Sequence, residues 1–272
     1  MLGKLFKYEW KSVSLLLAIM HVGLLIYTLV GRIGYQFFLH DYTGGPTEGL
    51  LGMGIIFYVL VYAIGIMVVV FMTVLYLAMR IQKSLFSDEG YLTNTLPVTP
   101  SQLLLSKAFI YWVWVIIDAL VMIASGLILI VNKETWPVIT RTFSEMWGSL
   151  ISVTGFSEVM NNIVYLLSLA IDFFCYHTGM LLFAICLGSL FKTHKIMGAV
   201  VSFFGLNIVS NIIMLFISGL VRTGPVTSLF ITTSYGRTHS SIYLFSTAWY
   251  LIAGIAFFFG SKYILTKKLN LE

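Results

Sequence analysis

Long apolar runs separated by short polar segments set the pattern of this chain. Six runs contain the roughly 18 or more apolar residues that mark a candidate transmembrane helix. They cover about residues 13–31, 51–79, 108–131, 163–191, 196–221 and 241–265. Because no other segment is long enough to fold as a soluble domain, we expect a single all-α integral membrane domain over residues 1–272, with six transmembrane helices.

The lengths of the runs and of the segments between them add detail. The second run, as a helix of about 43 Å, exceeds a hydrocarbon core of roughly 30 Å, so we expect part of it to project into the cytoplasm. Residues 192–195 are a very short polar turn, which predicts that spans four and five are neighbours. Residues 137–162 keep an apolar rhythm that favours a helix lying on the outer membrane surface.

The composition excludes a soluble globular protein. Hydrophobic residues make up 59% of the chain and charged residues 10%, whereas soluble domains carry about 25% charged residues. The mean hydropathy is +0.95. Cys175 and Cys186 both fall in the fourth run, so we expect ordinary packing there rather than a disulfide or a metal site.

The net charge of +5 reflects topology rather than nucleic-acid binding. With both termini in the cytoplasm, 11 of the 16 lysines and arginines fall on inner segments and 5 on outer ones. This bias follows the positive-inside rule. We therefore expect membrane lipid, and no nucleic acid, among the partners of the chain.

The first dozen residues form an amphipathic pattern. Leu2, Leu5 and Phe6 share one helical face, and Lys4 and Lys7 lie on another. The pattern predicts a short elbow helix in the cytoplasmic headgroup layer, although simple anchoring of the first span would also use these lysines.

A polar island from Ser87 to Lys107 separates the second and third runs. It carries Tyr91, Leu92 and Leu96 where only water would meet them, which favours a docking surface for another protein. A capped loop that merely joins two spans is the simpler alternative. Thr99-Pro100-Ser101-Gln102 has the form of a capping box with proline at the first helical position, so we expect the third span to start there.

The same segment resembles the first cytoplasmic loop of permeases in the type-2 ATP-binding-cassette (ABC) export family. That loop is similar to D-E-G-Y-L-T-x-T-L-P followed by x-x-x-x-L-L-x-S-K, matched here from Asp88 to Pro97 and from Leu104 to Lys107. Three shorter runs agree with the family: K-L-F-K-Y-E-W-K from Lys4, L-G-S-L-F-K-T-H-K-I-M-G from Leu187 and K-K-L-N-L from Lys267. With the six spans, the resemblance covers the whole chain.

The resemblance implies a cytoplasmic coupling helix between spans two and three that docks a cytosolic ABC ATPase. The residues at the contact would be Asp88, Glu89, Gly90, Tyr91, Leu92 and Thr93. It also implies a second permease, identical or related, and export of a peptide, antibiotic or lipid-like substrate across a bacterial plasma membrane. The family commonly has an extracellular helical insertion between spans five and six, but residues 222–240 are short here.

The chain contains no G-x-x-x-x-G-K-[ST] phosphate-binding motif. We therefore expect it to be a transport subunit that is not itself an enzyme and binds no cofactor, with ATP and Mg on the partner ATPase.

Ionisable side chains inside the spans are the other candidates. Asp118 lies near the middle of the third span, and Asp172 precedes Tyr176 and His177 in the fourth; Tyr176, four residues on, is expected to share the face of Asp172 more closely. His21 lies midway along the first span. Buried charges in a membrane are costly and mark functional candidates, here a polar translocation path, a proton relay or interhelical hydrogen bonds that hold the bundle.

Two rival functions follow from these side chains. The main rival is a proton-coupled secondary transporter that uses Asp118, Asp172 and His177. An integral-membrane enzyme is the weakest, since no cluster of carboxylates and histidine lies at either end of the spans.

Other polar and aromatic residues in the spans indicate packing or lipid contact. Asn207 and Asn211 are one helical turn apart, and Gly198 and Ser202 have a spacing that favours close helix packing. The tryptophans, such as Trp114, are expected at lipid or in an interfacial belt.

Overall fold

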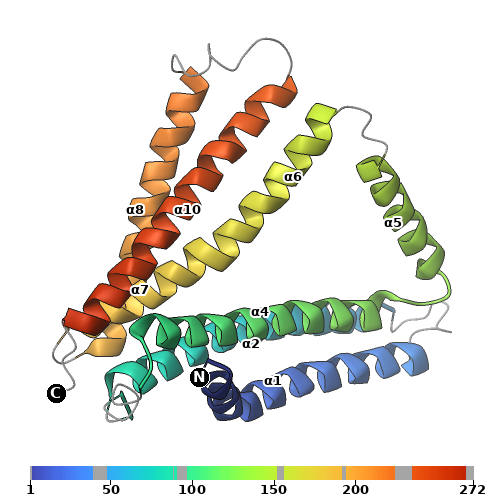
Figure 1. Ribbon diagram of the computed structural model, residues 1–272. Coiled ribbons are helices and arrows are strands. Elements are labelled where there is room, and N and C mark those ends of the chain that lie inside the picture. Colours follow the sequence, from blue (N-terminus) through green and yellow to red (C-terminus); the bar gives the residue numbers. More distant parts are fainter. Residues whose placement is uncertain are drawn as a thin grey trace. The chain divides into compact units, whose positions relative to one another are not determined.

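The computed structural model describes residues 2–38, 48–87, 89–90, 97–151, 156–191, 194–223 and 235–267. Within these residues the regular structure is entirely helical. The helices are α1 (Leu2–Phe38), α2 (Glu48–Phe86), α4 (Pro100–Ile130), α5 (Thr135–Ile151), α6 (Phe156–Ile171), the π-helix η1 (Asp172–His177), α7 (Thr178–Gly188), α8 (Lys195–Thr223) and α10 (Tyr235–Lys267) (Figure 1).

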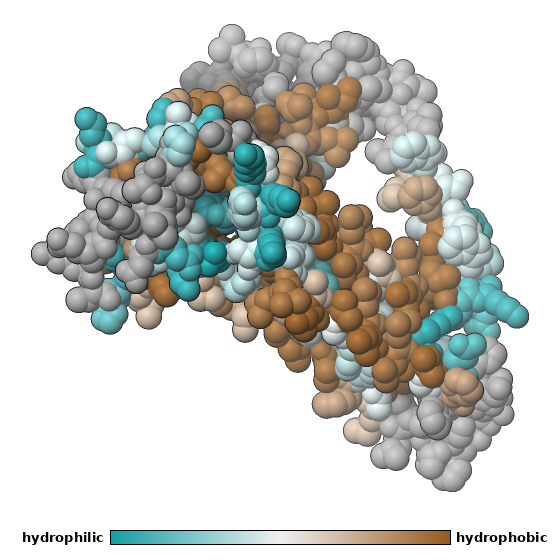
Figure 2. Space-filling model, turned by 60° about the horizontal axis from the view of Figure 1, so that its bottom comes forward, coloured by the Kyte–Doolittle hydropathy of each residue, from teal (hydrophilic) through white to brown (hydrophobic). Residues whose placement is uncertain are grey.

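Six helical stretches of the described residues are long and apolar enough to cross a membrane. They are Gly3–Phe37, Gly52–Phe86, Pro100–Ile130, Ile163–Gly188, Lys195–Ile217 and Phe245–Lys267. On the face drawn in Figure 2, apolar residues in brown cover much of the coloured surface, and hydrophilic residues in teal gather in separate patches. The expected six spans are therefore confirmed, and the chain is a multi-pass membrane protein.

The N-terminal residues belong to the same helix as the first span. Residues 2–11, predicted as an elbow helix, are helical, and α1 continues from them without a break to Phe38. In Figure 1 the first turns, in dark blue, run in a different direction from the rest of α1. The position of these turns in the headgroup layer stays a prediction.

The segment predicted to lie outside differs from the surface helix expected over residues 137–162. It consists of α5, which ends at Ile151, and of the first turns of α6, which begins at Phe156 and runs on into the fourth span. The start of α5 is fixed by Asn132, whose Oδ1 accepts hydrogen bonds from the backbone N–H groups of Glu134 at 2.9 Å and Thr135 at 2.6 Å. Such a side-chain cap satisfies N–H groups that have no partner within the helix.

The described chain divides into two compact units. Unit 1 contains Met1–Leu77 and Phe109–Met146, and unit 2 contains Ala78–Ala108 and Trp147–Glu272.

Unit 1 is held together by aromatic pairs that join α1 to α2 and α4. The rings of Trp10 and Trp114 stack at 5.0 Å, and those of Tyr27 and Tyr58 stack at 4.9 Å. Each of these tyrosines also donates to the backbone carbonyl of the other, Tyr27 at 3.3 Å and Tyr58 at 3.0 Å. Trp114 was expected at lipid or in an interfacial belt, but its side chain is buried inside the unit, so the expected lipid contact is wrong. Its ring stacks on that of Trp10 inside the unit, and such an aromatic pair gains favourable contact beyond the burial of area.

Unit 2 packs α7 between α8 and α10 through glycines. A Cβ atom on Gly188 would lie 2.5 Å from the backbone nitrogen of Ala199 in α8, and one on Gly179 would lie 2.9 Å from the carbonyl oxygen of Gly254 in α10. The close contact of α7 with α8 confirms that spans four and five are neighbours. Small residues allow this approach because they keep side chains out of the interface between backbones.

We predict that Gly188→Ala destabilises the protein by about 1–3 kcal/mol, because the new methyl group has to push the α8 backbone away. Gly205→Ala on α8 is the matched control, since a Cβ at Gly205 meets no atom within 4 Å. Thermal unfolding in detergent, followed by circular dichroism, measures the difference. Equal melting temperatures for the two variants would contradict the packing described here.

Candidate functional site

The chain turns sharply where α2 ends, at the start of the predicted docking segment. The Ser87 hydroxyl donates to the Lys83 carbonyl one turn back, and the Gly90 N–H donates to the Ser87 carbonyl at 2.7 Å. Glu89 and Gly90 are helical, and Gly90 is buried. The first described residues after α2 thus fold back into a new helical turn instead of extending the span.

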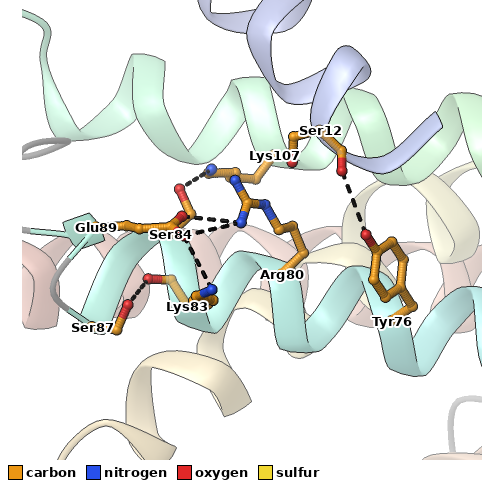
Figure 3. Close-up of polar contacts among 8 residues, drawn as sticks. All are labelled: Ser12, Tyr76, Arg80, Lys83, Ser84, Ser87, Glu89 and Lys107. Carbon is orange, nitrogen blue, oxygen red and sulfur yellow. Dashed lines mark hydrogen bonds and ion pairs between the residues drawn. The ribbon is translucent and has the colours of Figure 1, made fainter. Parts of the chain in front are cut away.

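Glu89 ties this turn to α2. Its Oε2 lies 3.0 Å from Nη1 of Arg80, and its Oε1 lies 3.2 Å from Nζ of Lys83 (Figure 3). Partial burial alone would raise the pKa of Glu89, but hydrogen bonds and charge from Lys83 and Arg80 outweigh it, so the pKa lies below its ordinary value. The carboxylate is therefore charged and engaged with α2 at neutral pH.

Two lysines join α2 to other helices of unit 2. Lys107 of α4 is 1% exposed and donates from Nζ to the Ser84 hydroxyl at 2.6 Å (Figure 3). Lys195, at the start of α8, donates to the carbonyl of Phe86 at 3.4 Å. The end of α2 is therefore bonded to the beginnings of α4 and α8.

The predicted start of the third span is confirmed. The Thr99 N–H donates to Oε1 of Gln102 at 3.2 Å, and the Gln102 N–H donates to the Thr99 hydroxyl at 3.3 Å. This reciprocal pair is a capping box, and α4 begins with Pro100 directly after it.

The structure describes two of the six residues predicted to contact an ATPase, Glu89 and Gly90. Asp88, Tyr91, Leu92 and Thr93 lie outside the described residues. Arg80 and Lys83, which hold Glu89, were counted in the sequence only as topology signals, whereas Lys107 also ends the motif that resembles the permease family. The spacing of nine residues between Arg80 and Glu89 gave no sign of their contact, because it depends on the turn at Ser87.

Asp118 pairs with His21 inside unit 1. Its Oδ1 lies 2.5 Å from Nε2 of His21 and accepts a hydrogen bond from the Thr73 hydroxyl at 3.1 Å. All three side chains are buried, and they come from α4, α1 and α2. Sequence reasoning placed His21 and Asp118 each near the middle of a span but did not pair them. That shared depth was the available signal.

Asp172 pairs with His177 in unit 2, contrary to the expectation that Tyr176 would share its face more closely. The carboxylate Oδ2 lies 3.6 Å from Nε2 of His177. The expectation assumed an α-helix, whereas Asp172–His177 is a π-helix, in which i→i+5 hydrogen bonding brings residues five apart nearly above one another. Tyr176 is instead buried in a cluster with Met180 and Ala253.

The described residues contain no group of three or more His, Cys, Asp or Glu side chains that is able to hold a metal ion. The polar groups described above form two pairs of carboxylate and imidazole and one network at the end of α2.

Comparison of the chain with protein-family models, with curated proteins and with solved structures finds no match. The assignment of a function therefore rests on the residues and on the contacts described above.

We predict that Glu89→Gln lowers the hydrogen-exchange protection of the Gly90 amide at neutral pH, because the turn loses its charged tether. Because the folded pKa of Glu89 is lowered, the ion pairs stabilise the turn above the ordinary carboxyl pKa of about 4.3 and are lost as the pH falls through the lowered value. The protection in the unsubstituted protein should fall in that acidic window and that in Glu89→Gln should not. The effect is small, at most about 1 kcal/mol, because the carboxylate is 41% exposed.

Glu145→Gln is the control for this substitution, since Glu145 forms an exposed ion pair with Arg141 within α5 at 2.8 Å. It should leave Gly90 unchanged. Equal protection of Gly90 in Glu89→Gln and in the unsubstituted protein would show that the ion pairs do not hold the turn.

We also predict a strong energetic coupling between His21 and Asp118. Replacing either residue alone with alanine should destabilise the protein by about 3–5 kcal/mol, because the remaining partner is left buried without its counterpart. The double variant should lose clearly less than the sum of the two single losses, as measured by unfolding in a double-mutant cycle. Additive losses would mean that the two side chains contribute separately.

Proposed function

We propose that the chain is the membrane-spanning permease subunit of an ATP-driven ABC transporter. A separate cytosolic ATPase docks on residues 88–97 and carries ATP and Mg, and a second permease, identical or related, completes the membrane part. The complex resides in the plasma membrane, with both termini of the chain in the cytoplasm. The transported substrate is a peptide, an antibiotic or a lipid-like molecule, and it moves outward.

One observation carries this proposal: Glu89 and Gly90, within the segment that resembles a coupling helix, are bonded to the end of the span before it. Glu89 is bound through two ion pairs to Arg80 and Lys83 on α2. A docking element moves a membrane helix only when the two are linked stiffly enough for a displacement of one to shift the other. The ion pairs and the bond from Gly90 to Ser87 supply this link at the α2 side.

The link extends to the following span. The capping box of Thr99 and Gln102 fixes where α4 begins, and Lys107 of α4 is bonded to Ser84 of α2. A push on the segment between α2 and α4 therefore acts on both helices together. The ATPases, drawn together by ATP, would use this path to switch the cavity between the two permeases from inward-facing to outward-facing.

The proton-coupled secondary transporter remains the second candidate. The contact of Asp172 with His177 at 3.6 Å favours it, because proton relays in membrane transporters are built from neighbouring carboxyl and imidazole side chains. Transport that persists without ATP and stops with a protonophore would select this candidate.

We predict that a photocrosslinking amino acid at Leu92 captures a soluble protein with a Walker A motif. The same amino acid at Phe143 on α5, proposed to be on the outer side, is the control and should capture no such protein. Mass spectrometry of the adducts from membranes of the native host identifies the partner. A Leu92 residue that crosslinks only to lipid, or to a protein on the outer side, would refute the docking assignment.

The double variant Tyr91→Ala and Glu89→Ala should then weaken binding of that ATPase at least about tenfold, since an aromatic anchor and its support are both removed. Membrane insertion should be unchanged. Arg141→Ala with Glu145→Ala removes an exposed ion pair of α5 and serves as the matched double variant. Unchanged affinity in the first double variant would show that this surface does not dock the ATPase.

A further inference from the structure

The pair of His21 and Asp118 lies deep within unit 1. His21 is 5% exposed and Asp118 is 2% exposed. The ring of Trp114 lies 5.7 Å from the imidazole ring, centroid to centroid, and helps to cover it. Neither residue belongs to the network at the end of α2 on which the proposed ATPase docking depends.

The hydrogen-bond partners of His21 determine which of its two ring nitrogens is protonated independently of Asp118. Nδ1 lies 2.6 Å from the carbonyl oxygen of Leu17, one turn back in α1. A carbonyl oxygen only accepts, so Nδ1 is the donor and carries a hydrogen. Nε2 is therefore the nitrogen that faces Asp118.

One further proton has to lie between Nε2 and Oδ1, which are 2.5 Å apart. Without it, a nitrogen lone pair would point at a carboxylate oxygen at a distance where only a hydrogen bond is stable. The proton makes the pair either an imidazolium with a carboxylate or a neutral imidazole with a carboxylic acid. Both forms contain the same single shared proton and have no net charge.

Among the described residues, no further charged side chain contacts the pair. On α1 the nearest charged residues are Lys11 and Arg32, ten and eleven positions from His21, or about 15 Å along the helix. On α4 the nearest is Lys107, eleven positions from Asp118, and on α2 it is Arg80, seven positions or about 10 Å beyond Thr73. Loss of the shared proton would leave a buried negative charge, which an apolar interior strongly disfavours.

The remaining polar neighbours adjust to the pair without neutralising it. The Thr73 hydroxyl lies 3.0 Å from the Val69 carbonyl and 3.1 Å from Oδ1 of Asp118, and its single hydrogen serves one of them at a time. Tyr111 is the further titratable group that interacts electrostatically with Asp118. Among the described residues, Oδ2 of Asp118 has no hydrogen-bond partner and is the carboxylate oxygen left to accept another proton.

We propose that His21 and Asp118 form a proton-binding site in the middle of the spans, which holds one proton between Nε2 and Oδ1 while α1, α2 and α4 are packed together. The proton is exchanged with water only when these helices separate far enough for water to reach Asp118. The site is independent of the ATPase assigned above, and the experiment uses the purified chain alone, so the two proposals fail separately.

The test locates the shared proton by two spectroscopic methods in the full-length chain in lipid nanodiscs. Nitrogen NMR with ring-labelled histidine reports whether Nε2 of His21 carries a proton, and loss of a signal in His21→Gln assigns it among the 5 histidines. Infrared difference spectra report whether Asp118 is a carboxylic acid, through a carbonyl band that disappears in Asp118→Asn. We expect one of these two signatures in the unsubstituted protein at neutral pH.

We further expect the proton between His21 and Asp118 to persist after transfer to heavy water, while the ring N–H protons of His177 exchange. His177 is a suitable internal control, because its contact with Asp172 at 3.6 Å is longer than a hydrogen bond and its side chain is 45% exposed. Tyr62→Phe is the matched control variant. It removes the bond of 2.8 Å to Ser125 in the same unit and should leave the His21 signals in place.

The proposal is overturned if Nε2 of His21 has the shift of an unprotonated nitrogen and no carbonyl band depends on Asp118. It is equally overturned if the shared proton exchanges with heavy water as fast as the ring N–H protons of His177. Both measurements on the unsubstituted protein stand even if Asp118→Asn fails to fold, because a site-specific isotope label on aspartate then assigns the band.

Discussion

A polar side chain that is cut off from water is stabilised by a polar partner elsewhere in the protein, and this constraint explains the buried contacts on which the helix packing depends. Asp118 is buried beside His21 and Thr73, because no water is available to solvate its carboxylate. The buried amine of Lys107 is held in the same way by Ser84. These hydrogen bonds also determine which helices pack together, because a polar side chain inside a span restricts its helix to positions where a polar side chain of another helix is within reach.

The sequence was sufficient to predict features that depend on local or uniform signals. The six spans follow from run length alone, and the capping box at Thr99 follows from residue types three positions apart. The pairing of His21 with Asp118 was not predicted, because it joins residues 97 positions apart and requires the packing of α1 on α4. The contact of Glu89 with Arg80 required the turn at Ser87, which no local pattern specified.

The misjudged details have a common physical origin. Tyr176 was expected on the same face as Asp172 because an α-helix places residues four apart on one face. The π-helix lengthens the hydrogen-bond spacing from four residues to five. Trp114 was assigned to lipid from its residue type, whereas the complementary ring of Trp10 gave it a buried partner. In both cases the outcome depended on a neighbouring helix or a local backbone change that composition does not report.

The π-helix also determines how the second half of its span is oriented. Each residue of an α-helix advances the chain by about 100° around the helix axis. The wider π-helical turn at Asp172–His177 therefore changes the direction in which every later side chain of α7 points. Gly179 and Gly188 are nine residues, about two and a half turns, apart, and therefore emerge on opposite sides of α7 toward α10 and α8. If this stretch became ordinary α-helix, α7 would rotate about its axis, and both glycines would leave their contacts with α10 and α8 together. The π-helix thus sets the rotation of α7 that places one glycine against each of its two neighbouring helices.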